Sequence, residues 1–221
     1  MVKDTRRNKI GWLAYQAESP TIDEGLVTDV QFELSGHSIP VDNGYALFQA
    51  LCELMPWLPD EELAGIHSVH APEPGLTKII LNRRARLSIR IPRIRVQEIL
   101  ALSGQSIAID GVPLLIGAGK MRPLTRHTPL FAHCVSTGSD DETVFAADII
   151  RLLDEMEIDS RFICGRRQSI RTADGVASGY SLMLHGLPVE HSILVQQRGL
   201  GNYRKIGCGI FIPHKSINAL T

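Results

Sequence analysis

The segment "LFAHCVSTGSDDETVFAADIIRLLDEMEIDSRFICG" (residues 130–165) decides the fold, because it carries strand, helix and strand signals in direct succession. Residues 140–158 are the clearest helix of the chain, and their acidic start suits the positive end of a helix dipole. Apolar residues at helical spacing form one face of this helix: Phe145, Ile149, Leu152, Leu153 and Met156. The short apolar segments on either side, 130–138 and 160–165, predict strands.

The residues that follow complete a recognisable unit. A hairpin is expected to turn at Asp174-Gly175, since this dipeptide suits a two-residue turn. A short helix is expected from Pro188 to Gly199, and residues 208–215 predict the last strand. The order is strand, helix, strand, strand, helix, strand, which is the split βαβ pattern of a ferredoxin-like domain.

The first half of the chain repeats this order of elements. Residues 27–36 alternate apolar and polar side chains, as a half-buried strand does. The other expected elements are a helix capped by Asp42 or Asn43 and ended by Pro56, strands at 77–82 and 86–92, a helix from Pro92 to Ser103, and a hairpin turning at Asp110-Gly111.

The repeated order predicts an α+β protein with two tandem ferredoxin-like domains. We expect a polar N-terminal extension at residues 1–27, a first domain at 28–122 and a second domain at 123–221. The polar segment 120–129 is the expected linker between the domains.

The composition is that of a globular protein, with 44% hydrophobic residues in a chain of 221 and a net charge of −1. No apolar run reaches the length of a membrane span, and the basic N-terminus lacks the apolar segment of a secretory signal, so we expect a cytoplasmic protein without a membrane partner. Four cysteines in apolar contexts predict small buried side chains rather than disulfides: Cys52, Cys134, Cys164 and Cys208.

The segment "GLGNYRKIGCGIFIPHK" (residues 199–215) contains two Gly-x-Gly pairs around a small basic segment. Glycines let backbone N–H groups approach a phosphate closely, and Arg204 and Lys205 would add positive charge. The alternative is a helix C-cap with a glycine-rich turn, in which both basic side chains are merely solvated.

Two groups of arginines are further candidates for RNA contacts. Strand alternation places Arg86, Ser88 and Arg90 on one face, and Arg83 and Arg84 lie in the turn before them. This face could contact an RNA backbone, or it could be a charged sheet edge that keeps the protein soluble. A second group begins the later hairpin and could equally be an ordinary wet turn; it comprises Arg166, Arg167 and Arg171.

The histidines carry no metal or catalytic motif. His67 and His70 are spaced as HxxH without an acid or cysteine at a helpful distance, so no zinc or other metal is expected. His133 lies within an apolar strand pattern and is expected to be packed rather than reactive, as is His185. His37 lies in a glycine-flanked turn before the first helix, without a neighbouring partner for acid–base work.

Several segments together resemble one protein family. The pattern Gly199-Leu200-Gly201, five residues, then Gly207-Cys208-Gly209 is similar to the C-terminal signature of the CRISPR-associated endoribonucleases that process repeat RNA, the Cas six family. The resemblance runs from about Val30 to Lys215. It also rests on the segments "VDNGYALFQAL" (41–51), "LNRRARLSIRIP" (81–92), "SGYSLMLHGL" (178–187) and "IFIPHK" (210–215).

The resemblance implies two tandem ferredoxin-like domains in a prokaryotic, cytoplasmic protein that binds CRISPR repeat RNA or crRNA. It implies cleavage at one phosphodiester without metal or cofactor, through attack of the 2′-hydroxyl that leaves a 2′,3′-cyclic phosphate and a 5′-hydroxyl. It also implies other subunits of a CRISPR effector complex as partners. Expected RNA contacts are Arg83, Arg84, Arg86, Arg90, Arg166, Arg167, Arg171, Gly199, Gly201, Arg204, Lys205, Gly207, Gly209, His214 and Lys215.

The chain departs from the family at one position. Related proteins carry a catalytic histidine in a context resembling Asp-His-Gly-Tyr, whereas this chain has Asn43 between Asp42 and Gly44. Asparagine forms hydrogen bonds but exchanges no proton near neutral pH. Three explanations stay open: a deliberate replacement that traps uncut RNA, a natural non-catalytic crRNA-binding subunit, or a takeover of catalysis by His37 or Tyr45. Whether this form is an active enzyme is therefore left open.

Overall fold

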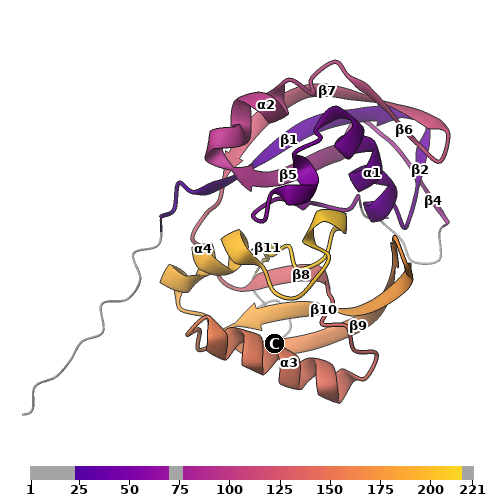
Figure 1. The fold of residues 1–221 in the computed structure, drawn as a ribbon. Helices are drawn as coiled ribbons and strands as arrows, with labels where there is room; N and C mark the ends of the chain where they lie inside the picture. The colour runs from indigo at the N-terminus through magenta and orange to yellow at the C-terminus, as the bar shows by residue number, and fades with distance from the viewer. Residues whose placement is uncertain (1–22, 70–76, 216–221) are drawn as a thin grey trace, which may run out of the picture.

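The computed structural model describes residues 23–69 and 77–215, which form two large antiparallel sheets, one above the other (Figure 1). The chain passes from the first sheet to the second between Pro123 and Leu130. Most of the expected N-terminal extension lies outside the described residues, as does His70.

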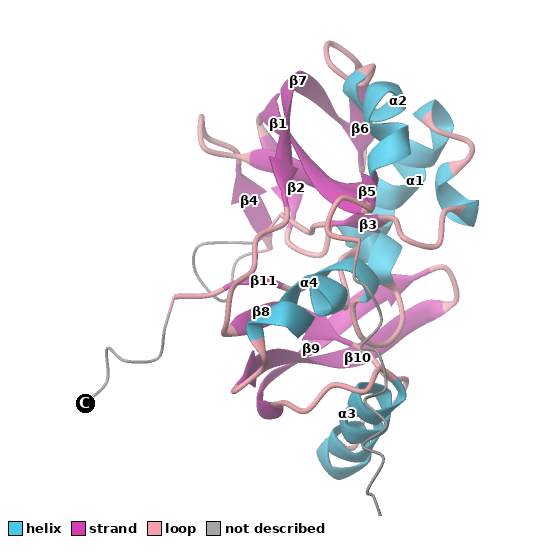
Figure 2. Cartoon of the chain, turned by 90° about the vertical axis from the view of Figure 1, so that its left-hand side faces the viewer, coloured by secondary structure: helices cyan, strands magenta, loops and turns pink. Residues whose placement is uncertain are grey.

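The first sheet has the strand order β3-β5-β1-β7-β6, with β1 paired antiparallel to both β5 and β7. Its strands are β1 (Val27–Gly36), β3 (Gly65–Ile66), β5 (Arg86–Pro92), β6 (Ser106–Ile109) and β7 (Val112–Pro123). Figure 2 shows α1 (Gly44–Leu54) and α2 (Val96–Leu100) on one side of this sheet. The alternating residues Val30, Phe32 and Leu34 of β1 are buried beneath them, as the period of two predicts.

Short elements connect the parts of the first domain. Strands β2 (Ser38–Pro40) and β4 (Lys78–Ile80) pair in a small separate sheet. Single 3₁₀ turns occur at Leu58–Asp60 and Arg93–Arg95, and a further one, at Arg204–Ile206, belongs to the glycine-rich segment of the second domain.

The second sheet has the order β11-β8-β10-β9, which is the 4-1-3-2 order of a ferredoxin-like domain. Its elements are β8 (Leu130–Val135), α3 (Glu142–Glu155), β9 (Arg161–Thr172), β10 (Gly175–His185), α4 (Val189–Arg198) and β11 (Ile212–Pro213). The Asp141 carboxylate caps α3 by accepting from the N–H groups of Thr143 and Val144. In both views α3 lies on the outer side, and α4 lies between the sheets.

The predicted fold of two tandem ferredoxin-like domains is confirmed, while several element boundaries differ, among them the three that follow. The last strand shrinks to two residues because the N–H groups of Cys208 and Gly209 bond to carbonyls within the glycine segment and β8. The second helix is preceded by a 3₁₀ turn rather than starting at Pro92. Residues 120–123 of the expected linker belong to β7, because they pair with β1.

One buried side chain joins the two domains. Arg90, on β5, is 1% exposed and holds the Asp29 carboxylate through Nε and Nη2, at 2.7 and 2.9 Å. Its Nη1 donates to the carbonyls of Gln196 and Phe211 in the second domain, at 2.8 and 2.9 Å. The predicted RNA contact at Arg90 is therefore wrong. At Arg90, strand β5 is covered on both faces, by the core of its own domain and by the second domain.

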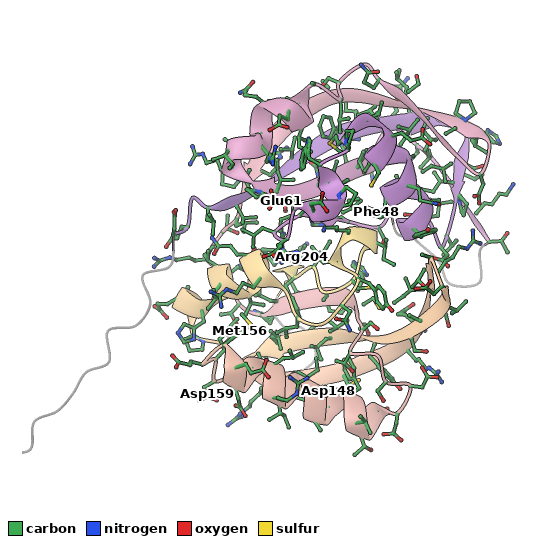
Figure 3. The ribbon with its side chains drawn as sticks, viewed as in Figure 1. Phe48, Glu61, Asp148, Met156, Asp159 and Arg204 are labelled. Atoms are coloured by element: carbon green, nitrogen blue, oxygen red, sulfur yellow. The ribbon has the colours of Figure 1, made fainter. Side chains whose placement is uncertain are left out.

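A second arginine lies beside it. Arg204 Nη2 donates to the same Gln196 carbonyl at 3.2 Å, and Figure 3 shows its side chain between the two sheets. Burial, reinforced by the charge of Arg90, lowers the pKa of Arg204 to about 9, so the side chain remains a cation at pH 7. Two guanidinium groups thus meet a carbonyl near the C-terminal end of α4, where the helix dipole favours cations.

We predict that Arg90→Met lowers the free energy of unfolding by about 3–5 kcal/mol, because it leaves the Asp29 carboxylate and two carbonyls without their partner. Urea unfolding at pH 7 measures the loss. The control is Arg86→Met in the same strand, whose guanidinium donates to the nearby carbonyls of Arg83 and Ala85 and bridges no domains among the described residues. We expect the control to change stability by about 0.5 kcal/mol or less. Equal losses in the two variants would contradict the role given to Arg90.

Asp29 predicts a specific dependence on pH. Burial alone would raise the pKa of its carboxyl, but Arg90 and His67 outweigh burial and hold it well below its usual range. Its contribution is therefore complete above the unfolded pKa, at about pH 4, and is lost as the pH falls below that value.

The test compares the urea unfolding of two variants: His67→Gln alone, and His67→Gln combined with Asp29→Asn. Both lack His67, so that the neighbouring titrating group is removed. The stability difference should stay constant from pH 7 to pH 5 and shrink below about pH 4. A difference that shrinks already between pH 7 and pH 5 would contradict the lowered pKa.

Candidate functional site

A cleft opens between the two domains where α1 begins. Its walls are residues 41–44 before and at the start of α1, residues 168–170 of β9, and residues 206–208 of the glycine segment. Ser68, together with His133 and Cys134 of β8, completes the lining. The Asp42 carboxylate accepts from the N–H of Arg171 at 3.0 Å, which ties one wall to the other across the domain boundary.

Asn43 lies buried in this cleft and serves as a brace. Its Nδ2 donates to the carbonyls of Pro40, Val41 and Val69 at 3.0, 3.0 and 2.7 Å. Its Oδ1 accepts from the N–H of Val69 at 3.1 Å. Asn43 is the N-cap residue of α1, as one of the two expected candidates, but its side chain makes no capping bond to the helix. Asn43 instead holds the turn before α1 against the segment after β3.

The other two catalytic candidates lie elsewhere. Tyr45 packs with Phe48 against a small buried cluster of Cys134, Ile170, Ile206 and Cys208. His37 is exposed between β1 and β2 and is not among the residues that line the cleft. The structure therefore brings Asn43 into the cleft, places Tyr45 in the packing of its walls, and leaves His37 outside.

A histidine that we expected to be packed lines the cleft. His133 is exposed, lines the cleft, and lines an adjoining pocket with His67. The pairing of β8 with β10 shifts here, so that Ala132 and Val135, three residues apart, both reach the core. His133 lies opposite Ala132 and on the same face of β8 as Phe131, by ordinary alternation, and the bulge that follows lets Cys134 line the cleft as well.

The glycine segment packs tightly on itself and on the first domain. A Cβ on Gly209 (φ 64°) would lie 2.3 Å from the Leu200 carbonyl oxygen, and one on Gly207 (φ 101°) would lie 1.9 Å from Ser68 Oγ. Gly199 and Gly209 are buried, Gly201 is exposed, and Gly207 lines the cleft. The alternative of a helix C-cap with a glycine-rich turn therefore accounts for the two buried glycines. The RNA contacts predicted at Gly199 and Gly209 are wrong.

The two basic residues between the Gly-x-Gly pairs, Arg204 and Lys205, point inward. Arg204 contacts Gln196 as described and is half-buried, unlike Arg90, so its RNA contact stays a prediction. Lys205 Nζ donates to the Pro59 carbonyl of the first domain.

His214 and Lys215 are exposed beyond β11, where the ring of His214 packs against Phe131.

Most of the other arginines are exposed. Arg83 and Arg84 lie in the turn before β5, and Arg84 and the half-buried Arg86 line a groove that also includes Ser68 of the cleft. Arg166 and Arg171 are exposed on β9. Arg167 is exposed as well, but it pairs with Asp140 at 3.2 Å and donates to Ser178 Oγ. Exposed arginines thus flank the cleft from both domains.

Within residues 23–69 and 77–215, no group of three or more His, Cys, Asp or Glu side chains is arranged to hold a metal ion. The same part of the chain contains no helix long and apolar enough to cross a membrane.

The packing of the glycine segment predicts a large loss of stability for Gly209→Ala. The control is Gly186→Ala, since Gly186 has a similar φ of 67° but no atom within 4 Å of its Cβ position. The control should lose about 1–2 kcal/mol from its positive φ alone. Gly209→Ala should lose about 1–3 kcal/mol more, from crowding against Leu200, as measured by thermal and urea unfolding. Equal losses would mean that the close approach is unimportant.

Comparison with known proteins agrees with this architecture. The chain matches the family model described as Cas6 Crispr over residues 28–216. It is 32% identical over 189 residues to the CRISPR-associated endonuclease Cas6 of Myxococcus xanthus (strain DK1622), covering 85% of this chain and 82% of that protein.

Two solved structures share the fold. One, described as CRISPR associated protein Cas6, has a TM-score of 0.63 at 10% identity and covers 86% of this chain and 100% of its own. Another, described as an RAMP protein binding different RNA substrates, has a TM-score of 0.60 at 12% identity and covers 83% and 98%. Since the family match spans both sheets and the cleft between them, the chain belongs to the Cas6 family of CRISPR-associated proteins.

Proposed function

We propose that this protein binds CRISPR repeat RNA across the cleft between its domains and cuts it at one phosphodiester bond without a metal ion. The observation that carries the proposal is the cleft itself, which combines polar side chains from both domains with exposed arginines on either side. The family and the name of the Myxococcus relative, an endonuclease, support the same function.

The chemistry proposed is an internal transfer within the RNA. The ribose 2′-oxygen forms a bond to the adjacent phosphorus, and the bond from phosphorus to the 5′-oxygen breaks. The products are a 2′,3′-cyclic phosphate and a 5′-hydroxyl. Such a reaction requires a group that accepts the 2′-proton and a source of a proton for the leaving oxygen. Neither step requires a metal ion.

Basic residues around the cleft, together with two glycines of the glycine segment, would hold the RNA backbone. Contacts between arginine and phosphate supply affinity that does not depend on sequence and weakens with salt. The residues proposed for this role are Arg83, Arg84, Arg86, Arg166, Arg167, Arg171, Gly201, Lys205, Gly207, His214 and Lys215. Arg167 and Lys205 would have to exchange their present partners, Asp140 and the Pro59 carbonyl, for phosphate.

A second candidate function is a non-catalytic crRNA-binding subunit of a CRISPR effector complex. The observation that favours it is Asn43, whose amide makes four hydrogen bonds to the backbone and exchanges no proton. Partner subunits of such a complex and a place in the prokaryotic cytoplasm belong to both candidate functions.

The test incubates the wild-type chain and Asn43→His with the CRISPR repeat RNA of the source genome in excess EDTA. We expect both to bind, and the wild-type chain to yield a 2′,3′-cyclic phosphate product. A 2′-deoxy substitution at the scissile nucleotide should abolish cleavage and preserve binding, because it removes the nucleophile.

The possible outcomes separate the two candidate functions. Binding without cleavage by the wild-type chain would favour the non-catalytic subunit. Cleavage that requires a divalent cation would contradict the proposed mechanism. Failure of both chains to bind the repeat at low salt would contradict both functions.

A further inference from the structure

We propose that His133 takes the proton from the attacking 2′-hydroxyl in the cleft. The assignment rests on the function proposed above and names the residue that would perform its central proton transfer. It differs from the family expectation of a histidine at the start of α1, where this chain carries Asn43.

The position of His133 is the first argument. Its side chain lines the cleft that also contains Asn43, Ser68 and Gly207. His133 also lines the adjoining pocket, so it borders both the cleft and that pocket. Among the described residues that line the cleft, it is the one imidazole, the side chain best suited to proton exchange near neutral pH.

Other groups in and behind the cleft are poorly suited to accept this proton. Asn43 is held by four backbone hydrogen bonds, and the Asp42 carboxylate accepts from the N–H of Arg171. A hydrogen bond with Cys134 and burial raise the pKa of the Cys208 thiol, so it stays protonated and cannot act as a base. Tyr45 packs with the cluster behind the cleft.

The surroundings of His133 favour the form that accepts a proton. Partial burial lowers the pKa of His133, and electrostatic repulsion by the neighbouring His67 and His214 lowers it further. These two come from the segment after β3 and the segment after β11, while Asp42 faces the cleft from the start of α1. Since an ordinary imidazole has a pKa of about 6.5, a lowered value leaves the ring neutral at pH 7.

A neighbouring ring orients the imidazole. Phe131 lies edge-on to His133, with ring centroids 4.9 Å apart and an angle of 78° between the ring planes. This contact restricts the orientation of the ring, and a restricted base is what a positioned proton transfer needs.

The proposed step balances within the site. The 2′-oxygen bonds to phosphorus as its proton passes to His133, and the bond from phosphorus to the 5′-oxygen breaks. The leaving 5′-oxygen takes a proton from water, and the resulting hydroxide is neutralised by the proton on His133. The imidazole returns to its neutral form, so no metal, oxidant or other reactant is consumed.

The test measures single-turnover cleavage of the repeat RNA in EDTA by the wild-type chain, His133→Ala, His133→Gln and the control His185→Gln. His185 ends β10 and does not line the cleft or the adjoining pocket. We expect both His133 variants to cut roughly 100-fold or more slowly, the usual contribution of a general base, and the control to cut like the wild type. Thermal unfolding confirms that each variant is folded.

Two further readouts separate proton transfer from a structural role. Added imidazole should restore part of the cleavage by His133→Ala, because the cleft is open to solvent and free imidazole can replace the missing ring. The wild-type rate should rise with pH through a midpoint below about 6.5 and then level off, and this rise should disappear in the His133 variants.

Binding of each variant to RNA with a 2′-deoxy scissile nucleotide shows whether slower cleavage comes from weaker RNA binding. Unchanged binding with slow cleavage supports the assignment. Cleavage by His133→Ala within threefold of wild type overturns it and leaves the proposed function standing. A loss of binding as large as the loss of cleavage also overturns it, since His133 would then be a backbone contact. Absence of binding by the wild-type chain would instead contradict the proposed function itself.

Discussion

The guanidinium group of Arg90 is the constraint on which the arrangement of the two domains depends. It binds the Asp29 carboxylate within the first sheet and two carbonyls of the second domain, all at 2.7–2.9 Å. A charge buried this deeply is tolerated only when its hydrogen bonds are satisfied, so the two domains must meet in one relative position. The cleft beside Asn43 exists because that position is maintained.

The residues that resemble the family signature support the cleft more than they line it. Gly199 and Gly209 permit a tight turn, and Arg204 directs its charge toward the end of α4 rather than toward solvent. Asn43 braces the start of α1 in the same way. These signature residues therefore shape the cleft through packing. The side chains that face solvent around it are the exposed arginines and His133.

Periodicity and turn residues were enough to predict both domains, because helix α3 and the hairpins at Asp110-Gly111 and Asp174-Gly175 carry strong local signals. The same reasoning failed at Arg90, since alternation tells which residues share a face but not that a second domain will cover it. It failed at His133 because strand alternation puts this side chain opposite the core of its own domain, but does not tell that a cleft between the two domains lies there. Long-range packing decided both positions.

The central claim is that the RNA passes through the cleft between the domains, and photocrosslinking tests it most directly. The probe is a repeat RNA with a 2′-deoxy scissile nucleotide and 4-thiouridine beside the scissile phosphate, and mass spectrometry identifies the crosslinked peptides. We predict crosslinks to residues 41–44, 133–136 or 168–171, which form the walls of the cleft and their immediate continuation. Crosslinks confined to α3 on the outer side of the second domain would contradict the account.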